Sequence, residues 1–394
     1  MQLRSRRSHF SGWPADARPG IYAVTTNPML PAPVARQRLL LLDSSRDAPA
    51  LAESPYRGLL LRSVFSEALP SRAIVLEPAL GHLADGDIVR VDPQREELRV
   101  LFRPSAPQNS LLVTERCNSF CVMCSQPPRD VDDSALVDEI RRTIELIPRD
   151  TPTLGLTGGE PTLAGEGFFD LVRHACNYLP DTELHVLTNG RRFAEQALAA
   201  RLGELHHPGL RLGIPLYSEQ PDLHDFVVQA RGAFDETVKG LLNLAAEGIR
   251  IELRVVIHRH TYGRLAELAR FIARNLPFVE HVALMGLELI GFAKVNLGNL
   301  WMDPYDYGPQ LAQAVRTLER GGVPAVIYNH QLCVVPESVR SRCVKSISDW
   351  KNDYLPECDD CALKAQCGGF FSSGLGLATH SAHIAPFRHS GLIA

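Results

Sequence analysis

Six short apolar segments alternate with helical segments between residues 109 and 289. In the first helical segment, Val137, Ile140 and Ile144 recur at spacings of three and four, and the capping candidates Asp132 and Asp133 precede them. Six βα units in a row predict a parallel sheet with helices outside it, open or curled into a partial (β/α)6 TIM-type barrel. The predicted strands are 109–115, 153–159, 183–189, 211–218, 250–257 and 281–289. We assign residues 106–300 to this α/β domain.

The segments on either side of this domain have a different character. Residues 1–105 are rich in proline and short apolar runs, which predicts a small, mostly-β module. Its predicted strands are 38–43, 73–77, 87–92 and 97–102. Residues 301–375 hold a helical stretch, a predicted strand at 324–331 and most of the remaining cysteines. We expect residues 376–394 to form a loosely ordered tail.

Composition narrows the functional classes. The 394 residues carry a formal net charge of -4, and the calculated pI is about 6.4. Such a chain has no general attraction for nucleic acid or anionic membranes. No apolar run approaches the ~20 residues that span a bilayer, and the N-terminus lacks the apolar core of a signal peptide. We therefore expect a cytoplasmic protein whose nine cysteines serve metal or redox roles rather than disulfides.

Three of these cysteines form a compact C-x3-C-x2-C pattern directly after the first predicted strand. They are Cys117, Cys121 and Cys124. Thiolates suit iron–sulfur clusters and zinc, and the cysteines of a [4Fe–4S] cluster normally come in fours. Three thiolates with no fourth nearby would leave one iron open to a substrate or cofactor, as an open position does in catalytic zinc sites. A zinc knuckle or chance clustering is the alternative.

Three polar or glycine-rich segments fall at the predicted carboxyl ends of strands. They are the cysteine pattern, residues 158–161 (Gly-Gly-Glu-Pro) and residues 188–190 (Thr-Asn-Gly). In parallel α/β folds, ligands bind at the carboxyl ends of the strands. The sequence therefore predicts one ligand site to which all three segments contribute.

The cysteine loop and the Gly158-Gly159-Glu160-Pro161 turn together resemble the radical S-adenosylmethionine (SAM) superfamily, over about residues 109–290. The resemblance implies that Cys117, Cys121 and Cys124 hold three irons of a [4Fe–4S] cluster, while the amine and carboxylate of SAM chelate the fourth. An electron donor then drives cleavage of SAM to methionine and a 5′-deoxyadenosyl radical, which abstracts hydrogen from an unactivated carbon. Glycines in the turn allow close backbone approach, although the motif alone is more often a simple turn.

The same resemblance implies further cofactor contacts. Glu160 corresponds to the residue near the SAM ammonium, Ser218 to a ribose contact and Arg254 to a partner of the SAM carboxylate. Asn189 corresponds to a ribose or substrate contact. Met123 takes a position near adenine that is usually aromatic, and a thioether is adaptable enough to fill it. Each position also has a simpler interpretation as a cap, turn, ion-pair or packing residue.

A second cysteine set lies near the C-terminus. Cys358, Cys361 and Cys367 form a C-x2-C-x5-C pattern that resembles the auxiliary-cluster half of SPASM and twitch domains. Because no cysteine follows Cys367 in the sequence, the resemblance implies a twitch-like domain with at most one auxiliary [4Fe–4S] cluster. Cys333 is the favoured fourth ligand because it follows a predicted strand, and Cys343 is the alternative. A four-cysteine zinc site also fits the spacing.

The runs CNSFCVMCSQPP and SISDWKNDYLPECDDCALKAQCGGFF together resemble the HxsC maturase family of the His-Xaa-Ser system, over about residues 85–375. This implies a radical SAM enzyme that modifies a ribosomally made peptide (a RiPP), with a second radical SAM protein of the system as a partner. One alternative is a radical SAM enzyme acting on a small molecule or RNA, although the acidic balance argues against RNA. The other is a non-enzymatic protein with structural zinc sites.

Overall fold

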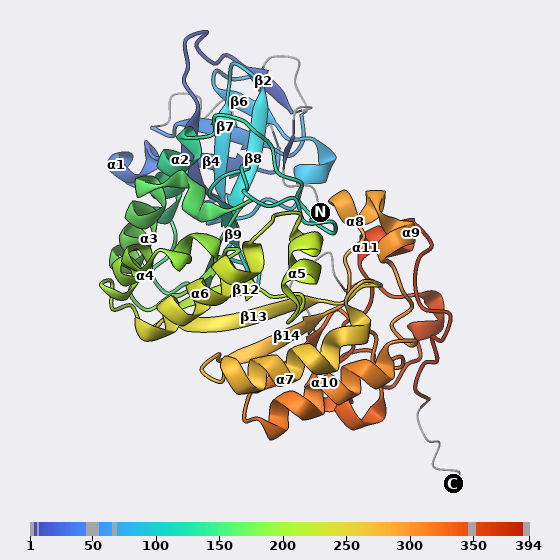
Figure 1. Ribbon diagram of the computed structural model, residues 1–394. Helices are drawn as coiled ribbons and strands as arrows, with labels where there is room; N and C mark the ends of the chain where they lie inside the picture. The colour runs from blue at the N-terminus through green and yellow to red at the C-terminus, as the bar shows by residue number, and fades with distance from the viewer. Residues whose placement is uncertain (1–3, 6–7, 45–54, 65–68, 346–351, 389–394) are drawn as a thin grey trace.

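The computed structural model describes residues 4–5, 8–44, 55–64, 69–345 and 352–388. Two eight-stranded sheets organise these residues, the N-terminal one coloured blue to cyan and the larger central one running from green to orange (Figure 1). Two stretches with predictions fall outside the described ranges. They are residues 346–351, which begin the run SISDWKNDYLPECDDCALKAQCGGFF, and residues 389–394 of the predicted tail. Within these ranges, no helix combines the length and apolar character needed to cross a membrane.

The central sheet is parallel throughout, and its spatial order follows the chain from β9 at one edge to β16 at the other. This confirms the predicted α/β fold class with a parallel sheet. The strands are β9 (Ser110–Leu112), β10 (Thr153–Thr157), β11 (Glu183–Leu187), β12 (Leu210–Pro215), β13 (Arg250–Val256), β14 (His281–Met285), β15 (Ala325–Tyr328) and β16 (Cys343–Val344).

The sheet extends beyond the six predicted units. Strand β15 pairs with β14, with Met285 opposite Tyr328, and β16 pairs with β15. The strand predicted at 324–331 therefore exists but continues the central sheet. The short apolar run AVIY does not indicate which sheet the strand joins, because the pairing partner of a strand is determined by the tertiary fold. The division of function between residues 106–300 and 301–375 stays a prediction.

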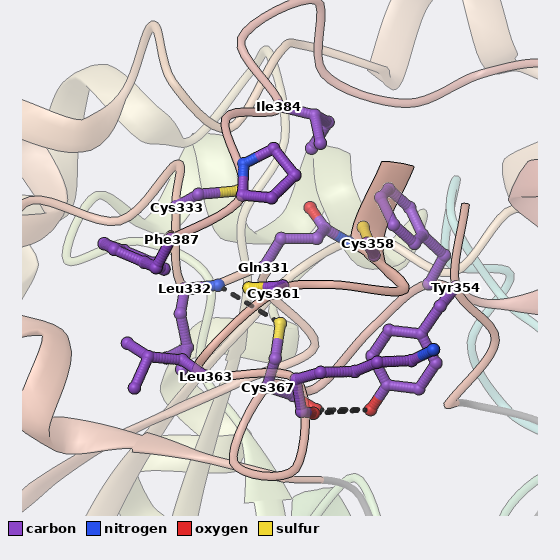
Figure 2. Close-up of a pocket in the computed structure, with 13 residues that line it drawn as sticks. Gln331, Leu332, Cys333, Tyr354, Cys358, Cys361, Leu363, Cys367, Ile384 and Phe387 are labelled. Carbon is purple, nitrogen blue, oxygen red and sulfur yellow. Dashed lines mark hydrogen bonds between the residues drawn. The ribbon is translucent and has the colours of Figure 1, made fainter. Parts of the chain in front are cut away.

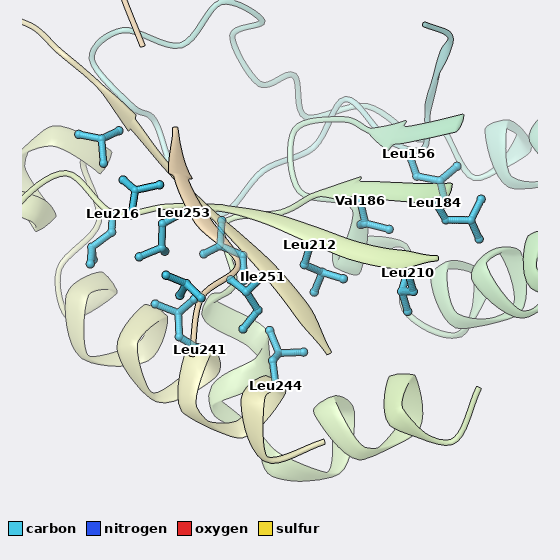
Figure 3. Close-up of a cluster of buried hydrophobic side chains, with 14 of the residues drawn as sticks. Leu156, Leu184, Val186, Leu210, Leu212, Leu216, Leu241, Leu244, Ile251 and Leu253 are labelled. Atoms are coloured by element: carbon cyan, nitrogen blue, oxygen red, sulfur yellow. The ribbon is translucent and has the colours of Figure 1, made fainter. Parts of the chain in front are cut away.

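Helices cover one face of the central sheet. On β13, Ile251 and Leu253 point to the same side as Leu241 and Leu244 of α6, and all four are buried (Figure 3). Because side chains alternate along a strand, Glu252 and Arg254 point to the opposite, polar face. The main helices are α2 (Ala135–Ile144), α3 (Glu166–Tyr178), α4 (Gln196–Gly203), α5 (Pro221–Val228), α6 (Ala233–Ala246), α7 (Leu265–Asn275) and α10 (Gly308–Arg320).

The N-terminal module is the mostly-β unit that the sequence predicts, with more strands than expected. Its strands are β1 (Arg4–Ser5), β2 (His9–Ser11), β3 (Gly20–Thr25), β4 (Arg38–Leu42), β5 (Gly58–Leu61), β6 (Ala73–Val75), β7 (Ile88–Asp92) and β8 (Glu97–Phe102), with one short helix, α1 (Ala32–Ala35). Strands β1 and β2 occupy opposite edges of the sheet. Since four residue steps from Ser5 to His9 span at most roughly 14 Å, the sheet must curl until its edges approach.

The C-terminal region contains three short helices and a packed final segment. The helices are α8 (Gly291–Val295), α9 (Leu297–Leu300) and α11 (Ser372–Gly376). After α11, the His383 ring stacks on Tyr305 with ring centroids 3.9 Å apart, and the Ala382 amide donates to the Asp303 carboxylate at 2.9 Å. The prediction of a loosely ordered tail is therefore wrong for residues 377–388. The glycine- and alanine-rich composition of this segment gives no indication of its contacts with Tyr305 and Asp303.

Candidate functional site

The first cysteine set lies in the loop between β9 and α2, at the carboxyl end of β9. Cys117, Cys121 and Cys124 are free thiols of intermediate exposure. Burial raises the pKa of Cys117 to about 11 and that of Cys121 to about 12, with smaller contributions from the neighbouring cysteines of the loop and, for Cys117, from Glu160. These thiols therefore influence one another, and they stay protonated at neutral pH unless a positive centre stabilises the thiolates. A bound metal does this, because a coordinating thiol loses its proton. The donor set thus fits a metal cluster.

The glycines at the end of β10 allow the cysteine loop to pass directly over the sheet. A Cβ atom on Gly159 would lie 2.3 Å from the Arg116 carbonyl oxygen, and one on Gly158 would lie 2.5 Å from the Thr114 carbonyl oxygen. The Gly159 amide donates to the Thr114 carbonyl, and the Glu160 amide donates to the Arg116 carbonyl, both at 2.8 Å. Side chains at either glycine would push the loop away from β10. The turn is therefore part of the cysteine loop's support.

Glu160 is fully buried and ties the ends of two strands together. Its Oε1 accepts hydrogen bonds from the Thr162 amide at 3.0 Å and from the Thr162 and Thr188 hydroxyls at 2.6 and 2.7 Å. Its Oε2 accepts from the Asn189 amide at 2.6 Å. This carboxylate therefore fixes the 188–190 turn after β11 next to the Gly158–Pro161 turn after β10. The predicted contact with the SAM ammonium stays a prediction.

The turn after β11 contacts the cysteine loop directly. The Asn189 side-chain amide donates to Oδ1 of Asn118 at 2.6 Å. Arg191 donates to the Asn118 carbonyl at 2.5 Å and to the Ser119 hydroxyl at 3.2 Å. Its Nε also pairs with Glu236 of α6 at 2.6 Å. The sequence analysis missed Arg191; its place two residues after Asn189, at a strand end, was the available signal.

Two further segments hold the other side of the loop. The Phe120 and Val122 amides donate to the Val228 and Val227 carbonyls, at 3.0 and 2.9 Å, at the end of α5. Asn296, between α8 and α9, donates from Nδ2 to the Val122 carbonyl at 2.8 Å. Segments from 189 to 296 thus fix the loop from several directions. These hydrogen bonds hold the backbone of the cysteine loop, as supporting contacts do around a binding site.

Met123 lies on the inner side of this loop. It is buried, and it packs in a small apolar cluster with Tyr217, Val227 and Ala293. Burial, together with the neighbouring Cys121 and Cys124, raises the pKa of Tyr217 well above its usual value. The structure thus shows Met123 as a packing residue of the loop, and its predicted place near adenine stays a prediction.

Ser218 and Arg254 lie at the same end of the sheet. Ser218 is buried just after β12, and its hydroxyl accepts a hydrogen bond from the Gln220 amide at 3.1 Å. Arg254 pairs with Glu252 at 2.7 Å, and its charge acts on Tyr217 together with those of Cys121 and Cys124. Arg254 therefore lies near the cysteine loop. The predicted ribose and carboxylate contacts of these residues stay predictions.

The second cysteine set comes together around one hollow. Cys333, Cys358, Cys361 and Cys367 all line it (Figure 2). Cys343 is not among the described residues that line it, although burial and the nearby Cys367 raise the pKa of Cys343 to about 12. Of the two candidates for a fourth ligand, Cys333 is thus the one that borders the hollow. As the side chains stand, no three of the described His, Cys, Asp or Glu residues form a group that could hold a single metal ion, and this applies to both cysteine sets.

The packed C-terminal segment forms part of the wall of this hollow. Ile384, Pro386 and Phe387 line it together with the cysteines, and the Ala362 amide donates to the Phe387 carbonyl at 2.8 Å. The guanidinium of Arg340 lies 4.7 Å from the centre of the Phe387 ring. The sequence analysis missed these residues because nothing in their composition marks them as neighbours of the cysteines.

Comparison with known proteins identifies the central domain. Residues 111–272 match the model of the Radical SAM superfamily, so the chain carries a domain of this superfamily. The superfamily implies a [4Fe–4S] cluster and SAM as cofactors. The match covers most of the central sheet but not the cysteines after residue 300.

Individual relatives match only in part. A probable GTP 3',8-cyclase of Methanocella arvoryzae is 30% identical over 33% of this chain and 40% of its own length. An Fe-coproporphyrin III synthase of Methanosarcina barkeri is 28% identical over 37% of this chain and 36% of its own length. The chain thus spans well under two thirds of these relatives.

Solved structures also resemble the chain in part. SuiB of Streptococcus suis bound to S-adenosylmethionine gives a TM-score of 0.45 at 16% identity, covering 58% of this chain and 51% of SuiB. A radical SAM methyltransferase of Sphaerobacter thermophilus gives 0.44 at 17% identity, covering 66% and 74%.

Proposed function

We propose that this protein is an enzyme that uses SAM and a [4Fe–4S] cluster held by Cys117, Cys121 and Cys124. The observation that carries the proposal is the position of the three thiols: one loop at the carboxyl end of β9, inside the segment that matches the Radical SAM superfamily. When bound, the cluster and SAM supply a 5′-deoxyadenosyl radical that abstracts hydrogen from the substrate. Three thiolates leave one iron available for SAM.

The chain's own residues bind and orient the cofactors in this proposal. Arg254 binds the SAM carboxylate, because a planar guanidinium matches a carboxylate with two hydrogen bonds. Glu160 accepts from the SAM ammonium through Oε2, the oxygen that also accepts from the Asn189 amide at 2.6 Å. Ser218 and Asn189 lie on the ribose side, and Met123 supports the loop near adenine. An electron donor reduces the cluster.

We further propose that Cys333, Cys358, Cys361 and Cys367 hold one auxiliary [4Fe–4S] cluster. The support is that all four cysteines line one hollow. The spacing of the cysteines in the sequence does not choose between Cys333 and Cys343 as the fourth ligand. The amides of Leu332 and Gly369 lie 3.4 and 3.5 Å from Sγ of Cys367, where they stabilise a thiolate.

The proposed substrate is a ribosomally made peptide of the His-Xaa-Ser type, with a second radical SAM protein as partner. The support is the resemblance of both cysteine runs to the HxsC maturase family. A small-molecule substrate is the second candidate, and the partial match to a protein named as a probable GTP 3',8-cyclase favours it.

Coexpression with a His-Xaa-Ser repeat peptide, with and without the second radical SAM protein, tests the substrate. The expected result is a mass change in the peptide that disappears when Cys117, Cys121 and Cys124 are replaced by Ala. An unchanged peptide in the presence of both proteins would overturn the peptide proposal. If the purified enzyme still releases 5′-deoxyadenosine from SAM, the small-molecule candidate replaces it; zinc without SAM cleavage would support structural zinc sites instead.

A further inference from the structure

A buried carboxylate organises the polar face of the central sheet. Glu252 of β13 is 5% exposed, and side chains from three strands surround it. Its Oε1 lies 2.7 Å from Nη1 of Arg254, on the same strand. Its Oε2 lies 3.2 Å from Nε2 of His185 on β11 and 3.7 Å from Nε2 of His281 on β14. Burial alone would raise the pKa of Glu252, but these neighbours lower it to about 2. The carboxylate is therefore charged at neutral pH.

His185 reaches Glu252 across an intervening strand. Strand β12 lies between β11 and β13, and in the register of the sheet Gly213 pairs with Leu187 on one side and Glu252 on the other. A Cβ atom at position 213 would lie 2.8 Å from Nε2 of His185 and 3.1 Å from Cδ of Arg254. A glycine inside a strand often marks a place where another group approaches closely. Here it provides the space in which His185 and Arg254 meet Glu252.

Arg254 connects this arrangement to the candidate cofactor site. Arg254 pairs in register with Pro215, the last residue of β12, and its charge acts on Tyr217, which packs against Met123 of the cysteine loop. In the described part of the chain, Glu252 is the acceptor that contacts the guanidinium of Arg254. A guanidinium has five N–H donors, so one bond to Glu252 leaves others for a second carboxylate.

We propose that Glu252 is a positioning residue, which holds Arg254 in the orientation that receives the SAM carboxylate, with Gly213 providing the space for this contact. The inference rests on the proposed SAM-binding function and deepens it. A long arginine side chain has many rotamers, and a fixed guanidinium loses less conformational freedom when it binds its ligand. His185 and His281 hold Glu252 from the other side, so the carboxylate itself cannot follow a moving arginine.

Two substitutions test the proposal through geometry and charge separately. Gly213→Ala keeps every charge but intrudes on His185 and Arg254, whereas Glu252→Gln removes the charge of the positioning group. Gly263→Ala is the matched control, because a Cβ atom at Gly263 meets nothing within 4 Å. Each reconstituted protein is titrated with SAM, and binding is followed by the change in the electron paramagnetic resonance (EPR) spectrum of the reduced cluster. Iron content and kcat at saturating SAM are measured alongside.

The expected result is a SAM dissociation constant about tenfold higher in both test variants, as for the loss of a well-placed hydrogen bond to a charged group. Iron content and kcat at saturating SAM should match the unchanged protein, and Gly263→Ala should bind SAM normally. Unchanged affinity in Gly213→Ala and Glu252→Gln, with normal binding by the unchanged protein, would overturn the positioning role alone. If the two test variants lose iron to the same extent as they lose SAM affinity, the effect is purely structural, and the positioning role is also overturned. A spectrum that SAM does not alter in the unchanged protein would overturn the proposed SAM binding itself.

Discussion

The two cysteine sites of this chain are built in different ways. At the first site, three thiols lie within eight residues of one loop, Cys117 to Cys124, and neighbouring strand ends and helices hold that loop. At the second site, Cys333 joins three thiols from residues 358–367, and the C-terminal segment covers the hollow between them. The first is a local motif supported by the sheet, and the second is assembled by tertiary folding.

The difference suggests different roles for the two sites. Three thiols on one loop leave an iron without a protein ligand, which suits a cluster that binds SAM. At the second site, four cysteines line one hollow together with the apolar side chains of Ile384, Pro386 and Phe387. We therefore expect the first site to be open to small molecules and the second to be closed to them. The predictions below separate these properties.

The largest effect is expected at the loop. Replacing Cys117, Cys121 or Cys124 singly with Ala should lower SAM cleavage more than about 100-fold, beyond the 10–100-fold effects of residues that only support a metal ligand. The measurement is 5′-deoxyadenosine release from SAM under a strong reductant. Cys176→Ala is the matched control, because this buried thiol on α3 belongs to neither site. Normal cleavage in any of the three loop variants would refute the assignment.

The next largest effect is expected when the fourth ligand of the second site is replaced. Cys333→Ala should lower the iron content by up to about four irons per chain, the content of one cube. Cys343→Ala should leave it unchanged, because Cys343 is not among the described residues that line the hollow. Iron and sulfide analysis of the two purified variants decides between them. The reverse pattern would assign the site to Cys343 instead.

A smaller effect is expected from the arginine that anchors the loop. Arg191→Gln removes the contacts with Asn118 and Ser119 and the pair with Glu236. Hydrogen bonds to a charged group contribute about 1.5–3 kcal/mol each, so the first cluster should be lost to a chelator about tenfold faster. Arg201→Gln is the control, since Arg201 of α4 also forms an ion pair, but with the exposed Glu166 of α3 rather than with the cysteine loop. Equal rates in the two variants would show that the loop does not depend on Arg191.

The smallest effect is expected from opening the cover of the second site. Phe387→Ala removes one wall of the hollow and the ring beside Arg340, so a chelator should remove the second cluster several-fold faster. The first cluster, followed by its SAM-dependent EPR change, should be unaffected. Phe278→Ala, at an exposed phenylalanine, serves as the control. If the second cluster keeps its stability in Phe387→Ala, the segment does not protect it.

The sequence predicted what depends on local pattern. Alternating apolar and helical segments gave all six strands from β9 to β14, and the position of Cys117–Cys124 after the first of them placed the loop correctly. The glycines of the next turn were expected to allow close backbone approach. In the structure the group that approaches them is the cysteine loop itself.

Features that depend on distant parts of the chain were not predictable in the same way. The membership of β15 and β16 in the central sheet depends on pairing with β14, which no local pattern encodes. Arg191 and Phe387 gain their roles only when segments tens of residues apart meet. The contact of His185 with Glu252 likewise needs the register of three strands and the missing side chain of Gly213.

The most direct test of the two-site account is the iron content of the anaerobically reconstituted chain, compared with a variant in which Cys117, Cys121 and Cys124 are all Ala. We expect about eight irons per unchanged chain, from two cubes, and about four in the variant. We also expect 5′-deoxyadenosine to form from SAM in the unchanged chain only. Stoichiometric zinc in place of iron, or iron content that the triple substitution leaves unaltered, would contradict the account.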